Sequence, residues 1–139
     1  MLFELIYRSE ADTNVSDDDL LNILGKARRF NSKNELTGCL LYNDRHFVQI
    51  LEGEFNTLNE LYARIRKDSR HHNIITLHMK EIASRAYPDW TMAFKALEAD
   101  DMKSIKNALG ISQFKELNSI NEESPISKQL FWMVTQSIF

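Results

Sequence analysis

The order in which strand-like and helix-like hydrophobic patterns alternate is the feature that most constrains the fold of this chain. Apolar residues with a period of two, typical of strands, alternate with apolar residues at helical spacing. The pattern predicts strands over residues 2–8, 36–42, 46–51, 74–79 and 92–97, and helices over about 17–31 and 58–65. This order, βαββαββ with both helices crossing over, predicts an α+β fold: a ferredoxin-like sandwich of one mixed sheet with two helices on one face.

Local signals mark where these elements begin and turn. Ser16 is suited to cap the first helix, and Asp17–Asp19 place negative charge in its first turn, where the helix dipole favours it. Thr57 and Glu60 form a possible capping box for the second helix. The segment Asn43–Arg45, between two apolar runs, predicts a hairpin turn.

The character of the sequence changes after residue 97. Met102 and Ile105 indicate a short helix that ends at Gly110, and Ser124–Pro125 is typical of the start of another helix. We therefore expect one domain over residues 1–97 and a C-terminal helical extension over residues 98–139, made of two helices and not forming a separate domain.

Composition and charge exclude several classes of protein. The 139 residues carry 17 Lys and Arg against 20 Asp and Glu, a net charge of −3, which excludes a strong sequence-independent grip on nucleic acid. The longest apolar run, Leu130–Val134, is far too short to cross a membrane, and residues 1–10 do not have the pattern of a signal peptide. The single cysteine, Cys39, cannot form an intramolecular disulfide. We expect a cytoplasmic protein without a membrane or nucleic-acid partner.

Patterns typical of catalysis, metal binding or phosphate binding are weak. His71, His72 and His78 lack partners at ligand spacing, Cys39 has no histidine at useful spacing, and the four glycines do not form a phosphate-binding loop. We therefore expect no metal site and no enzymatic activity.

Polar residues on apolar faces are more informative. Tyr7 shares a strand face with Leu5, and Gln49 shares one with Leu51. A buried phenol or amide must find hydrogen-bond partners. The two residues therefore form either a satisfied core pair or the polar wall of a ligand pocket, and the residue pattern leaves both interpretations open.

Other candidate residues have an ordinary structural interpretation as well. Asn31 is suited to terminate the first helix. Arg64 and Asp68, four residues apart, fit a solvated ion pair on the second helix. Trp90 and Met92, at the start of the last strand, fit ordinary core positions.

Five segments of the chain form a more specific set. They are Leu5–Ser9, Asn31 with Leu36–Gly38, Phe47–Gly53, Arg64–His71 and Pro88–Met92. In this order and spacing they resemble the BLUF domain, a blue-light sensor that uses FAD, over residues 1 to about 96. The resemblance implies that the protein binds FAD non-covalently, with the flavin ring between the two helices and the sheet. FMN or riboflavin are possible substitutes for FAD.

The resemblance also implies roles for individual residues. Tyr7 is then the redox-active phenol, Gln49 the amide that links it to the flavin, and Asn31 the side chain that holds the flavin carbonyl and ring edge. Arg64 and Asp68 resemble further flavin contacts from the second helix. Trp90 and Met92 resemble residues that exchange places near Gln49 and pass the signal on, while Phe30 departs from the asparagine or histidine often found before Asn31.

The mechanism implied by the family is that of a switch. Under blue light Tyr7 gives the flavin an electron and then a proton, which Gln49 relays. Recombination leaves Gln49 rotated or tautomerised, the flavin spectrum shifts to the red, and a downstream signalling protein reads the change. The alternative is a flavin-free, ferredoxin-like interaction or small-molecule regulatory module.

Apolar residues near the C-terminus predict self-association. The final helix carries large apolar side chains on more than one stripe: Ile126, Leu130, Phe131, Trp132, Met133, Val134, Ile138 and Phe139. A helix lying on the open sheet face cannot bury all of them. We expect a homo-oligomer with the C-terminal helices on the sheet face away from the flavin.

Overall fold

A computed structural model describes residues 1–110 and 113–116 of the chain. The elements are β1 (Leu2–Ala11), α1 (Asp17–Lys33), β2 (Thr37–Asn43), β3 (His46–Glu54), α2 (Phe55–Lys67), β4 (His71–Glu81), β5 (Ala93–Ala96), α3 (Ala99–Leu109) and the 3-10 turn η1 (Phe114–Glu116). The predicted order βαββαββ is confirmed, and the expected final helix after Ser124 lies outside the described residues.

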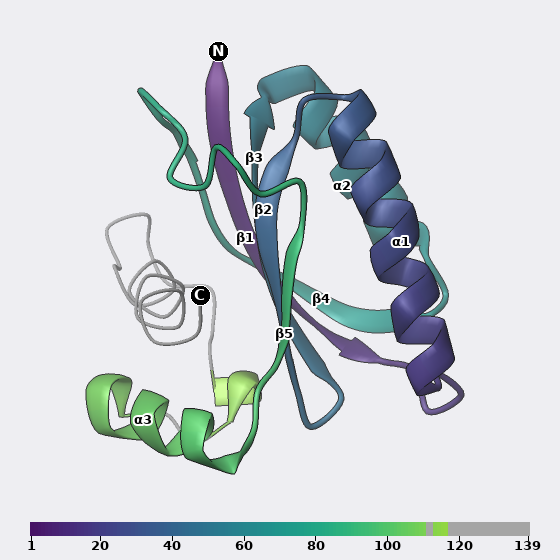
Figure 1. The fold of residues 1–139 in the computed structure, drawn as a ribbon, viewed down its shortest axis with the longest axis vertical. Helices are drawn as coiled ribbons and strands as arrows, with labels where there is room; N and C mark the ends of the chain where they lie inside the picture. The colour runs from purple at the N-terminus through teal and green to yellow at the C-terminus, as the bar shows by residue number, and fades with distance from the viewer. Residues whose placement is uncertain (111–112, 117–139) are drawn as a thin grey trace.

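The five strands form one sheet in the order β4-β1-β3-β2-β5. Neighbouring strands are antiparallel except β2 and β5, which are parallel, so the predicted mixed sheet is confirmed. Helices α1 and α2 cover one face, and α3 lies on the opposite side (Figure 1). The fold is the expected ferredoxin-like sandwich.

Alternation along the strands divides the core between the two faces of the sheet. On β1, Leu5 and Tyr7 belong to the cluster under α1 and α2, whereas Ile6 belongs to the cluster on the other face. In that second cluster, residues of α3 and η1, including Ile105 and Phe114, pack against strand residues. Among the described residues, no helix has the length and apolar character needed to cross a membrane.

The caps of the two crossover helices differ. As predicted, Ser16 caps α1: its hydroxyl accepts from the Asp19 backbone N–H at 3.2 Å. The predicted capping box at Thr57 and Glu60 is wrong, because α2 begins directly after β3 and Glu54 is its N-cap. The Glu54 carboxylate, at the end of the strand, accepts from the Asn56 backbone N–H at 2.7 Å and so satisfies the first turn.

The hairpin between β2 and β3 turns at Asp44 and Arg45, whose φ angles are 46° and 63°. Two consecutive positive φ angles match the twist of the flanking strands in a two-residue turn. The predicted turn is therefore confirmed, and it sets the register of β2 against β3, in which Leu40 is the Cα partner of Gln49.

Candidate functional site

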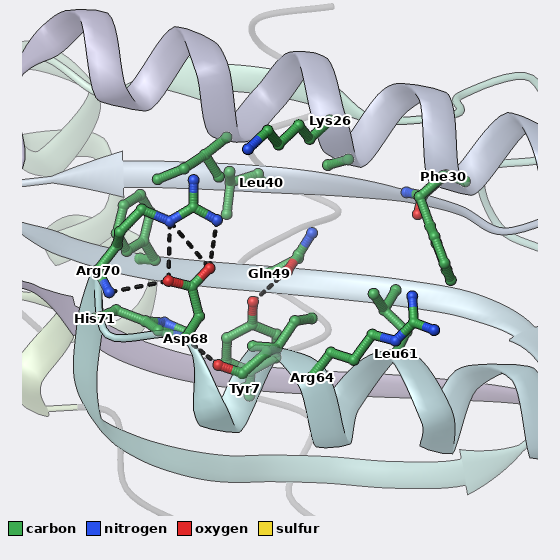
Figure 2. Close-up of a pocket in the computed structure, with 15 residues that line it drawn as sticks. Tyr7, Lys26, Phe30, Leu40, Gln49, Leu61, Arg64, Asp68, Arg70 and His71 are labelled. Atoms are coloured by element: carbon green, nitrogen blue, oxygen red, sulfur yellow. Dashed lines mark hydrogen bonds and ion pairs between the residues drawn. The ribbon is translucent and has the colours of Figure 1, made fainter.

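A cavity of about 330 Å³ lies between α1, α2 and the sheet (Figure 2). This volume is within the range of small-molecule sites. Its lining comes from both helices, from β1, β2 and β3, and from the link into β4: Tyr7, Ile23, Lys26, Ala27, Phe30, Asn31, Leu40, Phe47, Gln49, Leu61, Arg64, Ile65, Asp68, Arg70 and His71.

Tyr7 and Gln49 form the polar centre of the cavity wall. They are Cα partners on the antiparallel strands β1 and β3, and their side chains are only 4% and 5% exposed. The Tyr7 hydroxyl donates to Gln49 Oε1 (Figure 2). Burial is the main cause that raises the pKa of the Tyr7 phenol, and the neighbouring Tyr62 and Asp68 raise it further. Tyr7 therefore keeps its proton at neutral pH.

Met92 completes this arrangement from the segment that precedes β5. Its side chain is 2% exposed, and Gln49 Nε2 donates to its Sδ at 3.3 Å. Trp90 belongs to the other side of the sheet, where its ring stacks on Tyr87 with centroids 5.1 Å apart. The structure therefore brings Met92, and not Trp90, to Gln49.

Asn31 lies on the cavity-facing side of α1 and is 1% exposed. It does not end the helix, which continues to Lys33. Its Nδ2 donates to the Thr91 carbonyl at 2.7 Å, whereas its Oδ1 is buried with no hydrogen-bond partner in the described part of the chain. A buried acceptor without a donor costs about 1–3 kcal/mol, so the site favours a ligand that presents an N–H to Asn31.

Arg64 and Asp68 both line the cavity, but they do not form the ion pair that their spacing suggested. Asp68 follows the last residue of α2 and turns off the helix, where Arg70 binds it with Nε 2.9 Å from Oδ1. These hydrogen bonds lower the pKa of Asp68. Arg64 instead lies over the Phe30 ring, 5.3 Å from its centroid.

From the sequence, no flavin contact was assigned to Lys26, Arg70 or His71, although all three line the cavity. Lys26 and Phe30 lie four residues apart on α1, so helical spacing from Phe30, which precedes Asn31, is a signal for Lys26. Arg70 lies in the link between α2 and β4, His71 is the first residue of β4, and neither carries a periodic signal. Together Lys26, Arg64 and Arg70 give the cavity more positive than negative charge.

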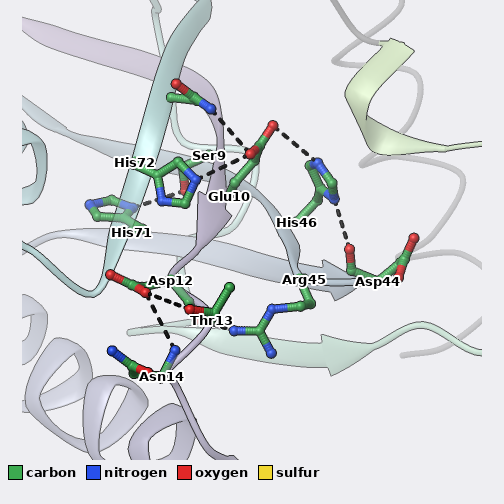
Figure 3. A network of polar contacts seen from close by, with 11 residues as sticks. Ser9, Glu10, Asp12, Thr13, Asn14, Asp44, Arg45, His46, His71 and His72 are labelled. Atoms are coloured by element: carbon green, nitrogen blue, oxygen red, sulfur yellow. Dashed lines mark hydrogen bonds and ion pairs between the residues drawn. The ribbon is translucent and has the colours of Figure 1, made fainter.

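A polar network at the end of β1 fixes the position of His71 (Figure 3). The His71 Nδ1 atom lies 2.9 Å from the Ser9 hydroxyl, and Nε2 bonds the Ile65 carbonyl. Next to Ser9, the Glu10 carboxylate lies 3.4 Å from His46 and 3.3 Å from His72. A hydrogen bond from Asn73, together with these histidines, lowers the pKa of Glu10. The network ties β1, β3 and β4 together beside the cavity.

Comparisons with known proteins agree with this fold and site. The family model for sensors of blue light using FAD, the BLUF family, matches residues 2–93. The beta subunit of a photoactivated adenylate cyclase from Euglena longa is 44% identical over 92 residues, which cover 66% of this chain and 11% of that protein. The chain thus spans about a tenth of the length of the Euglena relatives that it matches.

Solved structures give the same result. BlsA in its photo-activated state matches with a TM-score of 0.83 and 29% identity, over 96% of this chain and 94% of that one. BlrB, a BLUF protein in its dark state, matches with a TM-score of 0.75 and 28% identity, over 99% and 97% of the two chains.

Fold and cavity define a cofactor-binding α+β domain. The chain belongs to the BLUF family of blue-light sensors, which bind FAD non-covalently. The BLUF domain is a photosensor module without catalytic activity of its own, and BLUF homologues signal to partner domains.

The residues present fit a flavin. The orphaned Asn31 Oδ1 needs a donor, and the N–H of the flavin pyrimidine ring is one. Apolar side chains from both helices, including Ala27 and Leu61, offer the flat walls that a tricyclic ring requires.

Proposed function

We propose that this chain detects blue light through FAD held in the cavity, and that Tyr7 and Gln49 convert absorption into a changed hydrogen-bond pattern. The observation that carries the proposal is the Tyr7–Gln49–Met92 chain of contacts on the cavity wall. It links a buried phenol, an amide with both a donor and an acceptor group, and a residue in the segment that leads to the sheet edge.

Each flavin contact is assigned to a group of suitable chemistry. Asn31 offers its Oδ1 to the ring N–H, and Arg64, which lines the cavity from α2, donates to a ring carbonyl. Asp68, anchored by Arg70, offers carboxylate oxygens to the sugar-alcohol hydroxyls. Lys26, which is exposed at the cavity, suits the phosphates.

When bound and illuminated, the flavin supplies a strong oxidant next to the phenol. Tyr7 would then give one electron to the flavin and its hydroxyl proton to Gln49 Oε1, which already accepts from that hydroxyl, while Gln49 Nε2 would release a proton toward the flavin. Both the electron and the proton return to Tyr7 on recombination, so no net oxidation occurs. Gln49 is left rotated or tautomerised, and its Nε2 no longer donates to Met92.

The output of this switch is a change at Met92 that a downstream signalling protein reads. A partner protein is consistent with the Euglena longa relative, named as a subunit of a photoactivated adenylate cyclase. We also propose self-association, which rests on the apolar residues of 126–139, and a cytoplasmic location, which the lone buried thiol of Cys39 supports. The alternative of a flavin-free regulatory module predicts the same fold but a colourless protein.

Absorption spectra of the purified protein test the proposal. We expect a yellow protein whose flavin bands shift to the red under blue light and return in the dark. Gln49→Leu keeps the approximate volume and removes both hydrogen-bonding groups, so it is expected to bind flavin without the shift. A colourless protein contradicts flavin binding, and a long-lived red-shifted state in Gln49→Leu contradicts the role of Gln49.

A further inference from the structure

Glu52 is a buried carboxylate that the photochemical site does not use. It lies on β3, three residues after Gln49, and its side chain is 0% exposed. Because successive side chains on a strand point to opposite faces, Glu52 faces away from the flavin cavity. A buried carboxylate is costly unless donors satisfy it.

The donors to Glu52 come mainly from one irregular segment. The Ala86 backbone N–H donates to Oε2 at 2.6 Å, and the Tyr87 backbone N–H donates to Oε1 at 3.0 Å. The Thr37 hydroxyl on β2 also donates to Oε1, at 3.0 Å. Arg85 reinforces the connection by donating to the Glu52 carbonyl at 3.0 Å.

The same segment continues directly to the photochemical site. After Tyr87, the Trp90 carbonyl accepts from the Gly38 N–H at 2.9 Å. The Thr91 carbonyl accepts from Asn31, and the Met92 carbonyl accepts from Arg28 Nε at 3.0 Å. Residues 86–92 are therefore fastened at one end by Glu52 and contact Gln49 at the other through Met92.

We propose that Glu52 is a positioning residue for the photocycle, which rests on the function proposed above. By holding the backbone of Ala86 and Tyr87, it fixes the start of the segment that brings Met92 to Gln49. When Gln49 rearranges, Met92 moves while Ala86 and Tyr87 stay in place on Glu52. The same fixed backbone guides Met92 back to its dark position. Without the anchor at Glu52, the contact between Met92 and Gln49 loosens and the light state decays at an altered rate.

Glu52→Gln tests the anchor with little change in volume. Its amide nitrogen replaces one carboxylate oxygen and so places a donor against either the Ala86 N–H or the Tyr87 N–H. The matched control is Glu4→Gln, because Glu4 is the Cα partner of Glu52, is 1% exposed and bonds His78 on β4 at 2.9 Å. Both variants remove one buried carboxylate, but Glu52→Gln removes the acceptor of the Ala86 and Tyr87 N–H groups, whereas Glu4→Gln alters the bond to His78 on β4.

Two measurements are made on the full chain. In flavin-free protein, amide hydrogen exchange followed by NMR should be about tenfold faster at Ala86 and Tyr87 in Glu52→Gln than in the wild type, as expected for a lost hydrogen bond to a charged group. In flavin-loaded protein, the dark-recovery rate of the red-shifted state should change by about tenfold. Glu4→Gln should change neither the exchange rate nor the dark-recovery rate by more than about twofold, which is a smaller effect than the loss of one hydrogen bond would produce.

The proposal is overturned if Glu52→Gln exchanges and recovers like the wild type, or if Glu4→Gln changes both quantities equally. If Glu52→Gln does not fold, Thr37→Val carries the test. It removes one donor to Oε1, together with an acceptor of Arg85 Nη1, and keeps the carboxylate. A smaller change in the same direction is expected, and the absence of any change would contradict the proposal. A wild-type protein without a red shift refutes the proposed function, whereas the exchange measurement still tests the anchor.

Discussion

At the scale of single residues, the environment of Tyr7 determines what its phenol can do. The hydroxyl is buried, keeps its proton and donates to Gln49 Oε1. A phenol in this state can lose an electron and a proton together only if the acceptor can take the proton at once. The hydrogen bond to Gln49 meets this requirement before any light is absorbed.

Tyr7→Phe is expected to leave flavin bound and abolish the light-induced red shift. The ring keeps its packing against Tyr62, whose centroid is 5.4 Å away, so the fold should survive. Illuminated absorption spectra provide the measurement. As a control, Tyr42→Phe removes a phenol that packs on Phe47 and is not part of the cavity lining, and it should keep the shift. A normal red shift in Tyr7→Phe would show that another residue is the donor.

Asn31→Ala is expected to lower the amount of flavin retained through purification. The substitution removes the unsatisfied Oδ1 and the Nδ2 contact to Thr91. Asn34→Ala is the matched control: it removes an amide at the same end of α1, where Nδ2 donates to the Phe30 carbonyl at 2.8 Å, outside the cavity. The flavin-to-protein ratio should fall in Asn31→Ala alone. Equal ratios in the two variants would mean that Asn31 does not hold the flavin.

At the scale of elements, close contact between β2 and β3 sets the shape of the sheet beneath the cavity. A Cβ atom added to Gly38 would lie 2.1 Å from the Ile50 carbonyl oxygen, so only glycine fits there. Gly38 also donates to Trp90, which connects this contact with the 86–92 segment. Strand pairing and the position of Met92 therefore depend on the same residue.

A pair of glycine substitutions tests this dependence. Gly38→Ala should destabilise the protein by about 1–3 kcal/mol, the usual cost of overpacking. Gly25→Ala should stabilise it by about 0.5–1 kcal/mol, since Gly25 lies inside α1 and its nearest neighbour to an added Cβ is 3.7 Å away. Urea unfolding of both variants gives the free energies of unfolding. Equal stability of the two would contradict the close approach at Ile50.

At the scale of the whole molecule, the two faces of the sheet have different structural roles. The face under α1 and α2 holds the cavity, and the opposite face packs against α3 and η1. The segment 86–92 joins them, because Glu52 holds it on one side and Met92 belongs to the core of the other. A change at the cavity thus has a route to the opposite face, where the C-terminal extension begins.

Self-association is expected to depend on residues 117–139. Light-scattering masses of the full chain should exceed the 16.2 kDa of one copy, whereas a chain ending at Glu116, which keeps α3 and η1, should be monomeric. Light should shift the association equilibrium by about 1–3 kcal/mol, the usual range of such couplings. Circular dichroism checks that the shorter chain is folded. A monomeric full chain at high concentration, in darkness and in light, would contradict the prediction.

The local pattern of residues was enough to predict the order of the elements, the two-faced sheet and the apolar strand faces that carry Tyr7 and Gln49, but not whether the pair lines a pocket. These properties depend on neighbours in the chain, because side-chain period and turn chemistry act over a few residues. The resemblance to the BLUF family added the ligand, which no period encodes.

Only the tertiary structure decided which distant groups meet. It paired Asp68 with Arg70 and not with Arg64, because α2 ends one residue before Asp68. It also placed Met92 in the flavin-side core and Trp90 beside the opposite one, and brought Ala86 and Tyr87 to Glu52, 34 and 35 residues away. These contacts depend on the path of irregular backbone between β4 and β5. That path is set by hydrogen bonds to several other elements, so it has no signature in the residues of the segment itself.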